Sequence, residues 1–187
     1  GPEERIEMME QSRESRLDLE QAGEELFNFA VDREDVMWLV AQVPETVQVR
    51  RSKVEYELQI LKIISVGWGI SYYLGVSPHK GALLESYWGA VQELSRSVSA
   101  TAGQMTGQAI DYFQTVKERL DGYVTALARH CQATEPAAVI GPEFARTCGQ
   151  ANEIHTIASG TRMFLTTLDR VKQYIDARQL VPLNFAN

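Results

Sequence analysis

The amino-acid sequence predicts an all-α protein, an elongated up-and-down antiparallel four-helix bundle with one short extra helix. Apolar residues recur every seven positions along three long stretches, a spacing typical of helical bundles and coiled coils rather than strands. The six prolines leave residues 45–77, 79–135 and 143–181 free of the residue that disrupts helices most. With 187 residues, 44% of them hydrophobic, the chain is expected to form one domain over residues 1–187.

The first predicted helix, residues 3–30, is an acidic N-terminal arm. Residues 1–35 hold 12 acidic and 4 basic side chains, a net charge of −8, whereas residues 36–187 hold 13 acidic and 14 basic ones, a net charge of +1. Apolar residues gather only from Leu19 to Ala30. We therefore expect residues 1–30 to form an arm on a core at 36–178, and residues 3–25 to be mobile and removable without loss of stability.

A short helix is predicted at residues 33–43 and a longer one at 45–74. Asp32 is a good N-cap for the short helix, and Pro44 fits the first turn of the next. The seam of the longer helix consists of Val47, Val54, Leu61 and Trp68. Its last part, within the uncharged run Ile63–Val76, is apolar on all sides, so this part should be buried.

The third long helix is predicted at residues 82–131 and the fourth at 143–178. If the 82–131 stretch is unbroken, its seam of about 45 residues would span about 65 Å. Gly103 and Gly107 each cost about 1 kcal/mol within a helix and mark its weakest point. Residues 132–141 are expected to form the main loop, Pro142 to open the last helix, and residues 179–187 to form a tail.

The residues that usually carry catalysis do not form a known constellation here. No serine lies in a nucleophile-elbow pattern and no glycine-rich loop precedes a helix. Glu153 and His155 are two residues apart, which places them on different helix faces. On helices, His130, Cys131, Cys148 and His155 cannot converge on one zinc ion. We therefore expect no catalytic residue, no metal and no cofactor.

The two cysteines flank the expected loop at 132–141. Cys131 and Cys148 are interpreted as reduced, buried residues that pack as small hydrophobes. A disulfide between them is the alternative, since they lie on the two arms of a predicted helical hairpin.

Aromatic residues gather around the predicted chain reversal at residues 75–81. At helical spacing such residues usually form core, and this is the favoured interpretation. The alternative is a ligand or membrane region formed by Trp68, Tyr72, Tyr73, Tyr87 and Trp88.

These features favour a non-enzymatic protein–protein interaction or scaffold module with a protein partner, and a homo-oligomer is compatible with the long seams. A pI near 5.0 without a basic stripe argues against nucleic acid. A pore-forming or translocator-like membrane-acting protein is one alternative, in which residues 63–76 and 81–91 insert; the 14-residue apolar run is shorter than the about 20 residues of a span.

A ligand-sensing helical domain of a membrane receptor is the other alternative. Gly1-Pro2 resembles the remnant of a cleaved tag, so we interpret the chain as an excised domain or a processed product. A cytoplasmic location is slightly favoured, and a targeting segment of the parent protein would lie outside this sequence.

Overall fold

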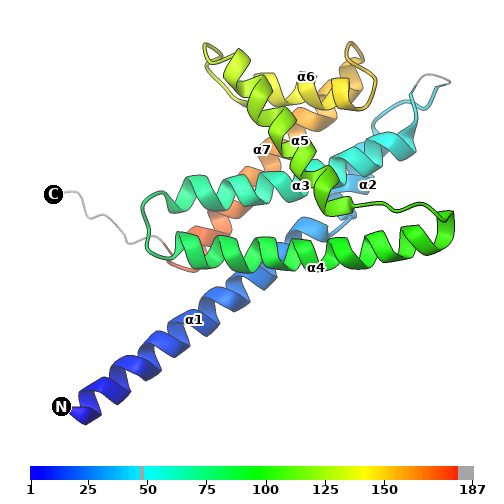
Figure 1. Ribbon diagram of the computed structural model, residues 1–187. Coiled ribbons are helices and arrows are strands. Elements are labelled where there is room, and N and C mark those ends of the chain that lie inside the picture. The colour runs from blue at the N-terminus through cyan, green and yellow to red at the C-terminus, as the bar shows by residue number, and fades with distance from the viewer. Residues whose placement is uncertain (47–48, 181–187) are drawn as a thin grey trace.

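The computed structural model describes residues 1–46 and 49–180, which form seven helices and no strand (Figure 1). The predicted all-α helical bundle is therefore confirmed. The helices are α1 (Pro2–Val31), α2 (Glu34–Ala41), α3 (Arg51–Leu74), α4 (Lys80–Thr106), α5 (Tyr112–Arg129), α6 (Ala137–Thr147) and α7 (Ile154–Ala177).

Only the second half of α1 belongs to the core. Residues 1–18 are exposed, and in Figure 1 this part of the helix extends away from the other helices. From Leu19 onward one face is buried, with Ala22, Leu26 and Ala30 following at helical spacing. This face packs against α4, where Ser86 Oγ donates a hydrogen bond to Glu20 O over 3.2 Å. The exposed part of α1 thus ends at Asp18, whereas the arm was expected to span residues 1–30, and the mobility expected for residues 3–25 stays a prediction.

Two truncations should separate the arm from the buried part of α1. Removing residues 1–14 should leave the melting temperature unchanged, because their side chains make no core contact. Removing residues 1–25 should cost at least about 2 kcal/mol, since it also deletes buried Leu19 and Ala22. Thermal unfolding followed by circular dichroism measures both. Equal stability of the two truncated proteins would contradict the packing of α1 on α4.

The central helix is α3, as its sequence predicts. Each residue from Ile63 to Gly67 is buried, as the uncharged run predicts, but the burial expected for the rest of the run was wrong at Tyr72, which is exposed. Gly67 lets the Trp88 ring of α4 approach the α3 backbone, and Gly69 does the same for Val171 of α7. The helix begins at Arg51 rather than at residue 45, because the Arg51 Nε group donates to Val43 O over 2.7 Å and anchors the preceding segment. The seam residue Val47 lies outside the described residues.

The long helix predicted at 82–131 is two helices, α4 and α5. The α4 helix ends at Thr106 and is capped by Gly107, whose φ of 69° is left-handed and suits glycine. The α5 helix begins after Asp111, whose carboxylate accepts a hydrogen bond from Gln114 N at 3.0 Å. Between them the chain changes direction, and in Figure 1 the connecting segment runs back above α4 before α5 rises away from α4 toward α6. The continuous rod was therefore wrong, and the break lies at one of the two weak glycines.

The helix predicted at 143–178 is also two helices, and part of the predicted loop at 132–141 is helical. The α6 helix starts at Ala137 and contains Pro142 in its interior. Gly149, with a φ of 74°, ends this segment, and the Glu153 carboxylate caps α7 by accepting from the backbone N–H groups of His155 and Thr156. Gly160 allows α6 and α7 to pack closely, since a Cβ there would lie 2.5 Å from Phe144 Cδ1.

Candidate functional site

The aromatic residues around the chain reversal divide between two environments. Tyr87 is fully buried, and its hydroxyl donates to Ile63 O over 2.5 Å, so burial raises its pKa well above the usual value. Trp88 packs against the backbone of Gly67. These two residues belong to the α3–α4 packing interface, in agreement with the core interpretation.

Trp68, Tyr72 and Tyr73 line an apolar groove with a volume of about 840 Å³. Half-buried Trp68 makes edge-to-face contacts with Phe164 of α7 and Tyr123 of α5, at centroid distances of 6.1 and 6.3 Å. Tyr72 is 78% exposed. The structure therefore brings together three of the five aromatic residues singled out in the sequence.

The rest of the groove comes from three other parts of the chain that the sequence did not associate with a site. The α5 helix contributes Leu127, α7 contributes Phe164, Leu165 and Leu168, and residues 135–137 come from the turn before α6 and its first residue. Leu165 and Leu168 carry a signal in the sequence, because they belong to the seam of the last helix, yet Leu165 is 50% exposed. That exposure makes the groove an open apolar concavity.

The lining of the groove carries a negative charge. Glu135 places a carboxylate among lining residues that are otherwise neutral in the described chain. Burial, with the neighbouring Tyr72 ring and then Asp169 and Asp176, raises the pKa of Tyr73. Both aspartates are exposed residues of α7, the helix that also supplies Phe164, Leu165 and Leu168 to the groove.

The α5 wall of the groove is held to α3 by a buried ion pair. Glu57 is fully buried, and its carboxylate accepts two hydrogen bonds from the Arg119 guanidinium, both at 2.9 Å. Lys53 Nζ lies 3.1 Å from the same carboxylate. This bidentate geometry fixes one face of α5, and the contact between Tyr123 and Trp68 fixes the next turn.

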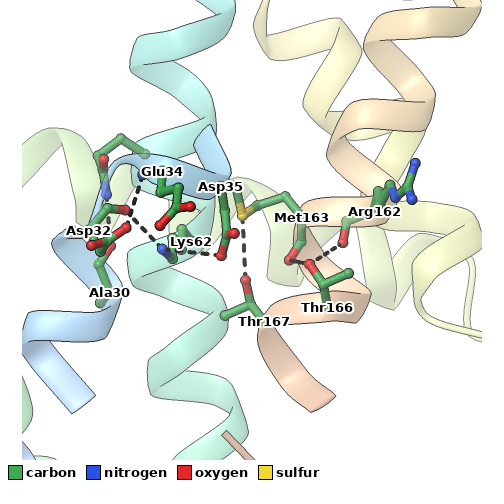
Figure 2. A network of polar contacts seen from close by, with 10 residues as sticks. Ala30, Asp32, Glu34, Asp35, Lys62, Arg162, Met163, Thr166 and Thr167 are labelled. Carbon is green, nitrogen blue, oxygen red and sulfur yellow. Dashed lines mark hydrogen bonds and ion pairs between the residues drawn. The ribbon is translucent and has the colours of Figure 1, made fainter. Parts of the chain in front are cut away.

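A second buried charge, Lys62, joins α3 to the junction of α1 and α2 (Figure 2). Its Nζ donates to Asp32 O over 2.8 Å, lies 3.6 Å from Asp35 Oδ2, and sits 4.5 Å from the centre of the Phe29 ring. Burial lowers the pKa of Lys62, and both aspartates oppose this shift. Because the Lys62 side chain is fully buried and its ammonium group has hydrogen-bonding and charged partners, we assign Lys62 a structural role.

The cysteines are both free thiols in different surroundings. Cys148 is buried, and this burial raises its pKa to about 12. Cys131 is exposed, because α5 ends at Arg129 and the following turn lies at the surface. The burial expected for Cys131 was therefore wrong.

Within residues 1–46 and 49–180, no group of three or more histidine, cysteine, aspartate or glutamate side chains could hold a metal ion. None of the helices in this described part is long and apolar enough to cross a membrane. Comparison with known proteins found no family model, no curated protein and no solved structure that matches the chain.

Proposed function

We propose that this protein is a non-enzymatic protein–protein interaction module, and that its groove receives an apolar segment of a partner protein. The observation that carries the proposal is the gathering of partly exposed Trp68, Tyr72 and Leu165 around one concavity. Exposed apolar patches of this kind mark binding surfaces, and aromatic residues are enriched among the residues that dominate binding energy.

The contacts that hold the lining residues in place support a groove that is already formed in the unbound protein. Its base is Trp68, held by two aromatic contacts, and its α5 wall is fixed by the Glu57–Arg119 pair. A rigid site loses little conformational entropy on binding, so more of the interaction free energy appears as affinity. Full burial of a leucine contributes about 1.5–3 kcal/mol, so half-exposed Leu165 has part of this free energy still to gain on binding.

A charge placed in the groove should abolish binding. Peptides selected by display on the wild-type protein are expected to be rich in aliphatic and aromatic residues, and to lose at least about tenfold in affinity on Leu165→Asp. The matched control is Val124→Asp on α5, because Val124 is also 50% exposed and does not line the groove. Fluorescence anisotropy with labelled peptides measures the affinities.

Two outcomes would overturn the proposal. One is equal binding of the selected peptides to the Leu165→Asp and Val124→Asp proteins, which would locate the site elsewhere. The other is a failure to select peptides while small apolar compounds bind in a manner sensitive to Leu165→Asp. The groove would then be a ligand pocket, as the ligand-sensing interpretation expects.

A further inference from the structure

We infer that the partner segment is a basic amphipathic helix, with lysine or arginine beside its apolar anchors. This inference rests on the proposed function of the groove and adds the chemistry of its occupant. The inference follows from two independent features. One is the shape of the groove walls, and the other is the charge of the acidic residues at and next to the groove, which we call the rim.

The walls suit a helix better than an extended strand. Residues of the groove follow helical spacing on both long walls, with Trp68 and Tyr72 four apart on α3 and Leu165 and Leu168 three apart on α7. Ridges and hollows made by such residues accept the side chains of another helix. The described residues contain no strand, so they offer no sheet edge to which an extended peptide could add.

The rim favours a positive partner. Glu135 lines the groove, and exposed Asp169 directly follows the lining residue Leu168 on α7. Arg129, Arg162 and Arg170, each two residues from a lining residue, do not contribute to the lining, and Arg162 and Arg170 lie over the rings of Trp38 and Phe29 instead. A lysine or arginine on the partner would therefore face acidic side chains, which favours association and correct orientation.

The same charges disfavour a second copy of this chain that inserts its own arm. The exposed residues 1–18 include Ile6, Met8, Met9 and Leu17, which could act as apolar anchors. However, this segment carries six acidic and three basic side chains and would bring like charge to the groove. A basic helix from another protein fits the rim better.

The test uses two helical peptides with the same leucine and phenylalanine anchors, one with lysine and one with glutamate on the flanking positions. We expect the lysine peptide to bind the wild-type protein about fivefold more tightly at low salt, with a smaller ratio at high salt. Glu135→Lys should remove or reverse that preference. Asp121→Lys is the matched control, because Asp121 is exposed on α5, does not line the groove, and undergoes the same change of charge.

Each result has a distinct meaning. If both peptides bind equally and both are lost on Leu165→Asp, the basic partner is overturned while the interaction groove stands. If Asp121→Lys changes the preference for the lysine peptide as much as Glu135→Lys does, the net charge of the protein rather than the rim determines that preference. The inference then fails. If neither peptide binds and peptide display selects nothing, the proposed function itself fails.

Discussion

Raising the pH above 10 is expected to unfold the protein cooperatively before pH 12. Tyr87, Tyr112 and Tyr123 are buried, and burial raises the pKa of each, to about 12 for Tyr112. In the unfolded chain these residues ionise near pH 10. Above that pH each tyrosine favours the unfolded state by about 1.4 kcal/mol per pH unit, or about 4 kcal/mol per unit for the three.

The direction in which stability changes with pH follows from the number of protons that the folded and unfolded states bind. Between pH 10 and 12 the folded state holds more protons than the unfolded state, so stability falls as pH rises. Cys148 acts in the same direction and from a lower pH, because its pKa is raised from 9.0 to about 12. Over two pH units the three tyrosines remove about 8 kcal/mol, which is comparable to a typical total stability of about 5–15 kcal/mol.

Lys62 has the opposite effect below pH 10.5. Its pKa is lowered in the folded state, so in the interval below 10.5 the unfolded chain binds more protons and stability rises with pH. This effect opposes the fall in stability that Cys148 causes above pH 9. A Lys62→Met variant, which has no titrating group at that position, should therefore lose stability more steeply than wild type as the pH rises toward 10.5.

Circular dichroism and tyrosinate absorbance, followed together against pH, test this alkaline transition. The helical signal should be lost in the same pH interval in which the buried tyrosines ionise. A Tyr87→Phe variant should show a pH dependence of stability that is shallower by one proton. Ionisation of all seven tyrosines near pH 10 with an unchanged helical signal would contradict their burial.

The helices were predictable wherever the local pattern decides the structure. The run around Ile63 is apolar on all sides, and no other placement than the interior buries it. The end of α4 was marked in the sequence by Gly103 and Gly107, but the seam continued in phase through Leu120. A helical period alone cannot distinguish one rod from two helices that each present the same face to a core.

The groove was less predictable, because it depends on which helix covers which residue. Leu165 and Leu168 look like ordinary seam residues, and α6 leaves Leu165 half exposed. The α6 helix itself was missed because Pro142 was expected to begin a helix. Its N-terminal turns instead include the apolar residues 137–140, which place Ala137 and Pro136 at the groove. Trp68, Tyr72 and Tyr73 were named in the sequence only within the less favoured ligand or membrane region, whereas their neighbours on α5, α6 and α7 required tertiary structure.

The second large effect is expected from Arg119→Met, which leaves Glu57 fully buried with a single basic partner. The variant loses two hydrogen bonds of 2.9 Å, while Lys53 remains 3.1 Å from the carboxylate and is 43% exposed. Breaking a buried pair on one side costs about 3–5 kcal/mol, and the remaining lysine should keep the loss near 3 kcal/mol. Urea unfolding measures the change in free energy.

A double variant tests whether the loss of stability in Arg119→Met arises from the buried Glu57 carboxylate, which has lost its hydrogen-bonding partner. Glu57→Leu with Arg119→Met replaces both partners by apolar side chains, and it should recover most of the stability lost in the single variant. Arg119→Lys keeps the charge but cannot form the paired hydrogen bonds, so it should fall between wild type and Arg119→Met. A cost below about 0.5 kcal/mol for Arg119→Met would show that water reaches Glu57. The α5 wall of the groove would then depend on the contact between Tyr123 and Trp68 instead.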